Sequence, residues 1–438
     1  MRARRGVSDE QHETDSCGVL AMSHIVIHRI FSLSVSLPVR GADGLAKRAV
    51  YGGVERQRLS SQSVKAHLRD ATGLNGSMAD LAQMLGTEMS VRSALIGRRR
   101  IEPALVKRGV EPEEAERWAT AVMELFQSGK EKTSTETAAP KKGKRKQSAA
   151  EEVADEAEAE DQTDTMQTAE AGRQVLTLGE AEIDALTTVA AVLRQNGVEC
   201  SKMRGLLEKS TKRKGQPKDV QDALAALDAT RRHSGLDGAL FGRMATGIAL
   251  SRVDSAVHVG HALTTHAIQS SVDFFSAQDQ LLDRDAGETG GAHIGSRELT
   301  AGVFYLPVVI DTAQMRKNFA GYSDTDIAKI VGWLVKSVAT VTPAAMLGST
   351  APFTDPGEVI VEVTNGQPVN AMGAFEQPVK PTIEASVAAF DRHIQRVWSM
   401  VGRPAAVLRL ADFIDPKQAS PAVQRLADAV VNAMHTVE

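Results

Sequence analysis

Residues 24–37 alternate between apolar and other side chains along the chain. β-Branched residues are frequent in this stretch, and a period of two with such residues predicts a half-buried strand. Arg29 interrupts the pattern, and the end of a barrel or a bound anion would account for a cation there. The apolar residues of one parity are Ile25, Ile27, Phe31, Leu33, Val35 and Leu37.

Helical spacing of apolar residues dominates most of the remaining chain. A glycine-containing basic loop is expected over residues 40–60, and VKAHLRDA predicts a helix that begins after Ser63. Leu81, Met84 and Leu85 recur on one helical face, and Trp118, Val122 and Phe126 repeat that spacing later. Further helical patterns cover residues 77–127, 175–196, 218–229, 326–340, 382–401 and 420–436.

A polar stretch over residues 278–297 lies between two strand-like segments, VDFFSA and ELTAGVFYLPVVI. Its glycines and its flanking strands predict an extended β-hairpin. Because side chains alternate along a strand, we expect Phe274 and Phe275 at the hairpin base to face opposite ways, with one in the core. A further strand, EVIVEV, is expected at 358–363, so the fold class is α+β.

Two segments lack the composition of a folded core. Residues 128–170 join a basic block, Lys141–Lys146, to an acidic one, Glu151–Asp164, with few large apolar side chains. Such a segment cannot bury enough surface to offset its ordering entropy. We expect a flexible insertion, either a solvated linker or a segment whose basic block touches nucleic acid. Residues 1–22 are expected to form a disordered leader.

The overall composition sets broad limits on the protein class. The chain has 438 residues, 42% of them hydrophobic, which is enough for one large domain or two. The two cysteines, Cys17 and Cys200, are too few for a disulfide framework, so a reducing cytoplasm is expected. No apolar stretch reaches the ~18 residues that a membrane helix needs.

Cations concentrate between residues 40 and 69, in a chain whose net charge is −4. With Ser60, Ser61, Gln62 and Ser63 they form a set of groups suited to a phosphate backbone. GGVERQR lacks the residue order of a nucleotide-binding P-loop. A serine-capped helix with a solvated basic face is equally compatible. The seven bases are Arg40, Lys47, Arg48, Arg56, Arg58, Lys65 and Arg69, against Asp43 and Glu55.

Three histidines, His258, His261 and His266, follow Asp254 and suggest a zinc site as one alternative. The unequal spacing and the absence of an HExxH motif or a nearby cysteine favour core or RNA-facing histidines. The sequence contains no GxSxG, Cys/His or kinase signature. We therefore expect no enzymatic activity, no metal and no cofactor.

Four segments provide a more specific indication. In chain order they are AVYGGVERQRLSSQSVKAHLR, FGRMATGIALSRVDSAVHVGHALTTHAIQSSVDFFSA, GGAHIGSRELTAGVFY and, more weakly, VNAMGAFEQPVKP. Together they resemble the Cascade backbone subunit family CasC of type I-E CRISPR systems, the Cas seven family. The resemblance extends from residue 25 to about residue 380, and the helical middle region does not match.

The resemblance implies a hand-shaped protein with an RRM-like palm, helical fingers and a β-hairpin thumb. The palm would comprise residues 23–70, 241–272 and 299–438. The fingers would comprise residues 71–240, including the insertion, and the thumb residues 273–298.

The resemblance also implies a function. Several copies would stack along one crRNA, and each thumb would flip out a nucleotide at regular intervals. The guide would then pair with target DNA beside the large, small, capping and crRNA-processing subunits, with no membrane partner. One alternative is a metal-dependent RNA-cleaving subunit of a type III-like complex that uses Asp43. Another is an assembly protein without an RNA site, which the basic stretch argues against.

The resemblance carries over to individual residues. Ser60, Gln62 and Lys65 match positions that hold the crRNA backbone, and Met244 matches one beside a flipped base. The chain departs from the family around Arg40, where Val39, Gly41 and Ala42 replace a more polar loop. It also has Gln377 and Thr382 where relatives often carry lysine. The remaining expected RNA contacts are Arg40, Lys47, Arg56, Arg58, Arg69, Phe275, Ser276 and Lys380.

Overall fold

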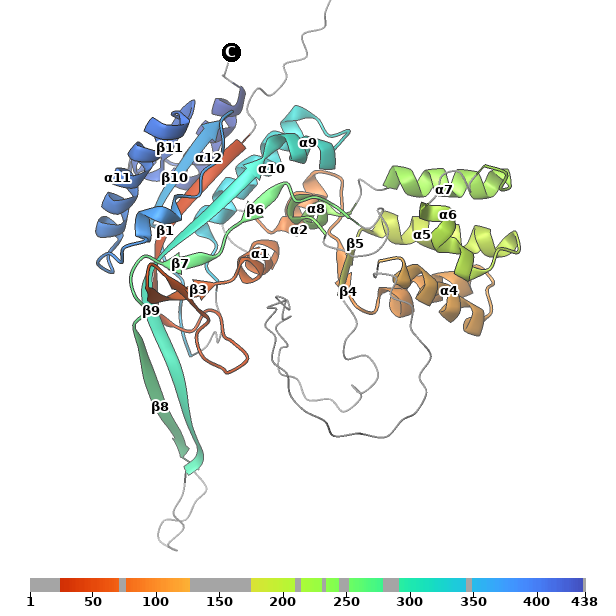
Figure 1. Cartoon of the computed structure of the whole chain (residues 1–438), viewed down its shortest axis with the longest axis horizontal. Coiled ribbons are helices and arrows are strands. Elements are labelled where there is room, and N and C mark those ends of the chain that lie inside the picture. The colour runs from red at the N-terminus through yellow and green to blue at the C-terminus, as the bar shows by residue number, and fades with distance from the viewer. Residues whose placement is uncertain are drawn as a thin grey trace, which may run out of the picture.

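The computed structural model describes residues 24–70, 76–126, 175–208, 214–230, 234–243, 252–278, 291–343 and 349–435. These residues form a sheet lobe, a helical lobe beside it, and a hairpin that projects from the sheet lobe (Figure 1). The expected leader, residues 1–22, the expected insertion, residues 128–170, and Met244 lie outside the described residues. No helix in the described ranges is long and apolar enough to cross a membrane.

The sheet lobe is built on a nine-stranded sheet with the order β11-β10-β1-β9-β7-β3-β2, in which β6 and β8 also pair with β9. β1 (His24–Ser36) lies between β10 (Glu358–Thr364) and β9 (Gly291–Asp311) and is antiparallel to both. This mixture of an antiparallel sheet and helices confirms the α+β class. The other strands of the sheet are β2 (Arg48–Tyr51), β3 (Val54–Leu59), β6 (Val257–Val259), β7 (Ala262–Thr264), β8 (Ser270–Gln278) and β11 (Ala406–Arg409).

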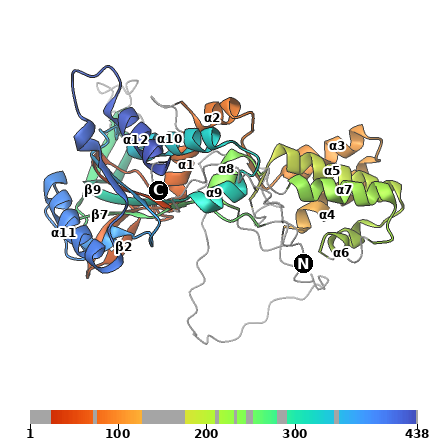
Figure 2. The same cartoon turned by 90° about the horizontal axis from the view of Figure 1, so that it is seen from above.

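Helices cover both faces of the sheet, as Figure 2 shows from above. Ile25 and Ile27 pack in one hydrophobic cluster with α10 (Asp324–Thr340) and α12 (Ala422–His435). Ile30 packs in a second cluster with α11 (Ile383–Val401). The expectation of a half-buried first strand is therefore wrong over its first half, because a central strand with helices on both sides has no solvent face.

The second half of β1 also departs from the expected pattern. The pairing with β9 shifts between Leu33 and Ser36, so that two β1 residues lie opposite one β9 residue. Such a bulge reverses which side chains point inward. As a result Ser36 is buried, whereas the apolar Val35 is 57% exposed.

Arg29 does not lie at a barrel end, because β1 is an inner strand of a sheet whose order begins with β11 and ends with β2. Its guanidinium is fully buried and donates to the carbonyls of Val338, at 3.1 Å, and Val341 at the end of α10. It also donates to the Pro356 carbonyl at 3.1 Å. Burial lowers the pKa of Arg29 to about 9, against the opposite effect of Asp355, so the side chain is charged at pH 7. Arg29 thus satisfies carbonyls at a helix end.

The basic loop expected over residues 40–60 is largely a β-hairpin, because β2 and β3 pair through Tyr51 and Val54. Gly52 and Gly53 form its two-residue turn with φ of 61° and 78°, a conformation that favours glycine. A Cβ at Gly52 would also lie 1.7 Å from the Glu376 carbonyl oxygen. The following helix, α1 (Ser61–Asp70), begins earlier than the expected start after Ser63.

The helical lobe has its own hydrophobic cluster, separate from the two clusters of the sheet lobe. Trp118, Val122 and Phe126 are buried in it, as predicted. Met84, expected on the apolar face of its helix, is instead 68% exposed. The lobe contains β4 (Val91–Ser93), the π-helical turn η1 (Gly97–Ile101), α3 (Glu102–Lys107), α4 (Pro112–Glu124), β5 (Leu176–Leu178), α5 (Glu180–Gln195), η2 (Cys200–Lys202), α6 (Met203–Glu208) and α7 (Lys218–Thr230).

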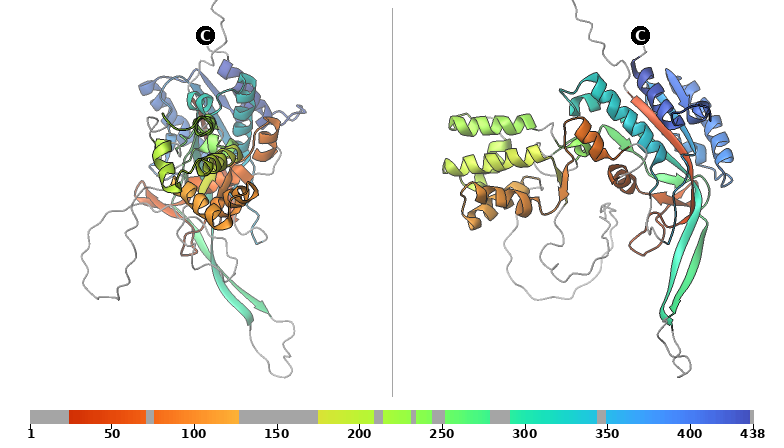
Figure 3. Two further views of the ribbon diagram at one scale, coloured as in Figure 1. Left: turned by 90° about the vertical axis from the view of Figure 1, so that its right-hand side faces the viewer. Right: turned by 180° about the vertical axis from the view of Figure 1, so that it is seen from behind.

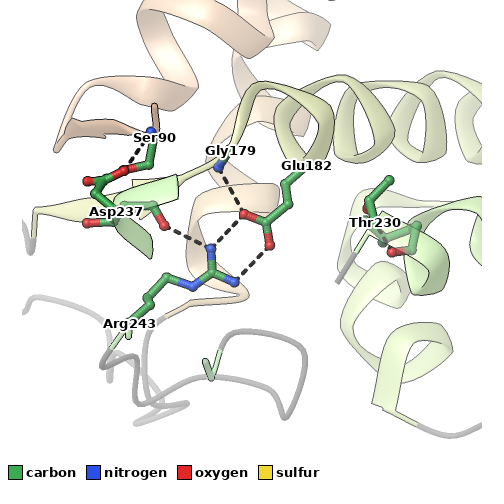
Figure 4. A network of polar contacts seen from close by, with 8 residues as sticks. Ser90, Gly179, Glu182, Thr230, Asp237 and Arg243 are labelled. Atoms are coloured by element: carbon green, nitrogen blue, oxygen red, sulfur yellow. Dashed lines mark hydrogen bonds and ion pairs between the residues drawn. The ribbon is translucent and has the colours of Figure 1, made fainter. Parts of the chain in front are cut away.

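A buried polar network joins the two lobes (Figure 4). Arg243 donates to both carboxylate oxygens of Glu182, at 2.8 and 2.9 Å, and both side chains are buried. Glu182 also accepts the N–H of Gly179 at the start of α5. Nearby, Asp237 in α8 (Leu236–Phe241) accepts the backbone N–H and the hydroxyl of Ser90 at 2.8 and 2.7 Å.

The hairpin consists of β8 paired with the first half of β9, so the predicted extended hairpin is confirmed for the described strands. It projects away from both lobes, as both views in Figure 3 show. The predicted helices over 218–229, 326–340, 382–401 and 420–436 and the strand at 358–363 are also present. Further elements are α2 (Met78–Met84), α9 (Thr312–Asn318), η5 (Ala371–Phe375) and η6 (Leu410–Phe413). The RRM-like arrangement and the palm, fingers and thumb boundaries remain predictions.

Candidate nucleic-acid interface

The first turn of α1 contains no acidic residue, although acids are favoured at helix N-termini. Ser60 is buried, and its hydroxyl accepts the N–H of Ser63 at 3.3 Å, so it caps the helix. The Ser61 hydroxyl donates to the Val259 carbonyl at 2.7 Å and fixes the helix start against β6. The positive end of the helix therefore has no acidic partner in its own first turn.

Cations gather around this helix start. Arg58 and Lys65 both act electrostatically on His261, whose Nδ1 accepts the N–H of Ser61 at 3.1 Å. The backbone N–H of Arg58 donates to the backbone carbonyl of Lys47 at 2.8 Å. This bond places a third cationic residue, Lys47, beside Arg58. We call Lys47, Arg58, Lys65 and His261 the basic row. Its charges and the helix end together favour an anion.

The members of the basic row are accessible at the surface. His261 is exposed, and Lys47, Arg58 and Lys65 are half-buried. The neighbouring Gln62, outside the basic row, is also exposed. The Nζ of Lys65 lies 5.8 Å from the centre of the Phe241 ring, which positions its alkyl chain. The structure therefore brings Lys47, Arg58, Gln62 and Lys65 together, as the sequence predicted for a phosphate-binding segment.

Arg56 does not belong to this surface, contrary to the prediction that it contacts RNA. It is fully buried, and its guanidinium donates to the carbonyls of Tyr51, Thr264 and Phe375 at 3.2, 3.2 and 2.8 Å. These bonds hold the β2–β3 turn against β7 and η5. Arg56 is a structural residue in this fold, because its donors are directed at the protein interior.

The loop of residues 40–47 is attached to the base of the hairpin. Buried Glu298 of β9 accepts the Ala46 N–H at 2.7 Å and pairs with Arg48. Burial alone would raise the pKa of Glu298, but hydrogen bonds from the Ala46 N–H and the Ser270 side chain, together with Arg48, hold it below its usual value. Arg40 is exposed on this loop. Glu298 thus links a cationic loop to the projecting hairpin.

Asp43, the aspartate of the RNA-cleaving alternative, lies exposed in the same loop. Its carboxylate accepts the N–H of Leu45 at 3.0 Å and so stabilises the turn that it forms. Across the described ranges, no three His, Cys, Asp or Glu side chains gather as a metal site. Asp43 therefore has a local role that accounts for its presence.

Aromatic residues lie exposed on the hairpin rather than in the core. Phe274 is 68% exposed and Val272, on the same face, is 74% exposed. Phe275 on the opposite face is half-buried and pairs with Gly295 of β9. The centre of its ring lies 5.1 Å from the Cζ of the Arg297 guanidinium. The two phenylalanines face opposite ways as expected, but neither enters the core, because the ribbon extends beyond the sheet. Ser276 is exposed beside them.

The remaining predicted residues lie apart from the basic row. Arg69 is in the last turn of α1, where burial and then Arg92 lower its pKa, against the effect of Asp237. Lys380 is exposed between η5 and α11. Thr382, where relatives often carry lysine, caps α11 by accepting the Ala385 N–H at 3.2 Å. The helix cap therefore explains why threonine occupies this position, without any contact with RNA.

The three histidines of the zinc alternative have different environments. His258 is exposed on β6, and His261 belongs to the basic row. His266 is buried, and its Nε2 accepts the Val303 N–H at 3.1 Å. His266 is therefore a hydrogen-bonded core residue, one of the two roles that the sequence favoured for these histidines.

The sequence reasoning missed a second concentration of cations, in the helical lobe. Residues 91–110 contain six bases and one acid, a charge imbalance that the sequence itself shows. Arg98 and Arg99 are exposed on η1, and Arg100 pairs with Glu180. Gly97 allows this turn to approach α4, because a Cβ there would lie 2.7 Å from Met123 Cγ.

Comparison with known proteins agrees with this architecture. A Cas family model described as CT1975-like protein matches residues 25–432. No curated protein matches the sequence. A solved chain titled "CRISPR RNA-guided surveillance complex, pre-nicking" is similar with a TM-score of 0.62 and 22% identity, over 94% of this chain and 100% of that chain. Another, titled "CRISPR RNA-guided surveillance complex", gives a TM-score of 0.55 and 21% identity over the same shares.

These structural likenesses show that the fold is shared, whereas the family match rests on nearly the whole sequence. The matched range includes every strand of the sheet except the first residue of β1, together with the basic row and the hairpin. The chain belongs to the family of CT1975-like proteins.

Proposed function

We propose that this chain is an RNA-binding backbone subunit of a CRISPR surveillance complex, in which several copies hold one guide RNA. The observation that carries the proposal is the basic row at the acid-free start of α1. Lysine, arginine and helix N–H groups bind phosphate oxygens without reading bases. That chemistry suits a protein that must accept any guide sequence.

Family membership and the shared fold support the wider context of this proposal. The bound guide would pair with target DNA, and the partners would be further copies of the chain and the large, small, capping and crRNA-processing subunits. The type I-E assignment and a cytoplasmic location belong to the same proposal.

The subunit would bind RNA without cutting it. The cleaving alternative depends on Asp43, and that carboxylate already accepts a hydrogen bond within its own turn. This contact accounts for Asp43 without a catalytic role, so we prefer the binding function.

Co-expression with a CRISPR array tests the proposal. The purified protein is expected to carry a protected RNA of uniform length, and a protein without bound RNA would contradict it. In titrations, Lys65→Ala should weaken binding to two unrelated single-stranded RNAs equally and lower the salt slope by about 0.7 per lost phosphate contact. Lys329→Ala, on the exposed surface of α10, is the matched control and should leave the slope unchanged.

A further inference from the structure

A pocket opens at the end of α11, in the part of the sheet lobe that lies away from the helical lobe (Figure 1). Its volume is about 220 Å³. A cavity of about 150 Å³ can hold benzene, whereas sites for drug-sized ligands begin at about 300 Å³. The pocket therefore has the size of one large side chain. Its lining includes Glu362 of β10, Trp398 and Val401 of α11, and residues 364–367 and 402–405.

Glu362 lines this pocket although only 3% of its surface is exposed. Its Oε1 accepts the indole N–H of Trp398 at 3.1 Å. The Nε2 of His28 lies 3.5 Å from the same oxygen and makes no hydrogen bond with the residues that the structure describes. Over the same residues, Glu362 Oε2 also makes no hydrogen bond, and this oxygen is not fully buried. Because a buried carboxylate is costly without a charged partner, Oε2 favours a cationic ligand.

The end of α11 strengthens this preference for a cation. Carbonyl groups at a helix C-terminus carry partial negative charge, and α11 has no basic residue in its last turn. Gly402, with a φ of 98°, ends the helix at the pocket wall. The next residue, Arg403, is exposed, and its Cζ lies 5.5 Å from the centre of the Trp398 ring. Among the described side chains, Arg403 forms no ion pair with Glu362, so the carboxylate does not depend on it.

We propose that this pocket binds a basic side chain of a partner protein, an arginine whose guanidinium donates to Glu362 Oε2. Val401, which lines the pocket, and its neighbour Met400 are 46% and 65% exposed. Protein interfaces commonly surround a buried arginine or aromatic anchor with apolar contacts. The pocket is separate from the basic row, so this inference goes beyond the proposed binding of RNA.

Arginine blocked by an acetyl and an amide group tests the cation site directly. On titration, the indole N–H resonance of Trp398 should shift, because that group donates to Glu362, and those of Trp118 and Trp333 should not. Blocked citrulline, which has nearly the same shape but no charge, should cause no shift. Equal shifts with the two compounds, or no shift with either, would overturn the site.

Glu362→Gln keeps an oxygen for the Trp398 N–H and removes the charge. It should weaken binding of blocked arginine about tenfold, the loss of a hydrogen bond to a charged group. Thermal unfolding checks that the variant is folded. Equal affinities of the parent and the folded variant would overturn the role of Glu362.

Arg403→Gln should have the opposite effect. The residue is exposed, so the variant should fold, and removing a like charge near the pocket should strengthen binding of blocked arginine. Weaker binding by this variant would show that the pocket is organised around Arg403, and would overturn the proposed cation site.

The complex co-expressed with a CRISPR array tests the protein partner. Glu362→Gln should lower the amount of one co-purified protein subunit, while the protected RNA remains. An unchanged composition would leave a small cation as the ligand and overturn the partner. If the parent carries neither RNA nor other subunits, the proposed function fails and the partner with it, whereas the titration with blocked arginine still decides the cation site.

Discussion

At the scale of single residues, Arg56 and Arg58 have different environments: Arg56 is fully buried, whereas Arg58 is half-buried in the basic row. Arg56 and Arg58 are two positions apart on β3, so alternation places both side chains on the same face of the sheet. Arg56 is covered because the carbonyls of Phe375 and Glu376 lie over it, a contact across more than 300 residues. No local pattern carries that information, and composition alone therefore assigned both arginines to RNA.

The same two arginines provide a prediction with an internal control. Arg56→Met should lower the free energy of unfolding by about 1–3 kcal/mol, because buried carbonyls lose their donor. Arg58→Met should change stability by less than about 0.5 kcal/mol and instead weaken RNA binding. Urea denaturation and RNA titration of both variants measure the two effects. Equal loss of RNA affinity in a folded Arg56→Met protein would place Arg56 at the interface after all.

At the scale of elements, length decided what could be predicted. The long periodic segments α10, α11 and α12 were identified because many residues repeat one pattern. β4, β5 and β11 have only three or four residues, and each is defined by a strand partner that the local sequence does not indicate. The π-helical turn η1 was missed for a similar reason, since it depends on packing of Gly97 against Met123.

The junction of the two lobes depends on one buried ion pair, Arg243 with Glu182. Removing one partner of such a pair leaves a buried charge, so Glu182→Leu should lower the free energy of unfolding by about 3–5 kcal/mol. The double variant Glu182→Leu with Arg243→Met should lose less than the sum of the single variants. Chemical denaturation followed by circular dichroism measures each loss.

The exposed pair of Arg100 with Glu180, at the start of the same helix, is the matched control for this prediction. Glu180→Leu should cost no more than about 1 kcal/mol, because solvent screens that pair. Similar losses for Glu180→Leu and Glu182→Leu would show that the buried pair has no special importance for the junction.

At the scale of the whole molecule, β9 connects the sheet to the hairpin. Its second half pairs with the central strand β1, and its first half pairs with β8 outside both lobes. The sequence predicted the hairpin from its glycines and flanking strands. The sequence did not indicate that β9, a single strand of 21 residues, belongs to both the hairpin and the sheet. Its second half belongs to the sheet because it pairs with β1, a strand that lies far away in the sequence. This continuity sets the direction in which the hairpin projects.

The continuity of β9 also allows the hairpin to be shortened without changing the sheet. Phe275 and Gly295 are direct partners, so a two-residue Asn-Gly turn can replace residues 276–294. Among the described residues between 270 and 300, none belongs to the three hydrophobic clusters, so the melting temperature should change little. Binding of a short RNA should also persist, because the basic row lies on other elements.

Assembly along a long guide should respond differently. We propose that the hairpin lies across the guide and reaches the next copy, so the shortened protein should lose the regularly spaced complex. Nuclease footprinting of the co-expressed complex should give periodic reactive nucleotides for the parent and none for the variant. In a second variant, a Gly-Ser segment of equal length replaces residues 279–290. This variant shows whether the spacing depends on the length of the hairpin or on the side chains of that segment. If the shortened protein keeps the periodic footprint, the hairpin has no part in spacing the copies, and contacts between the lobes must set the repeat.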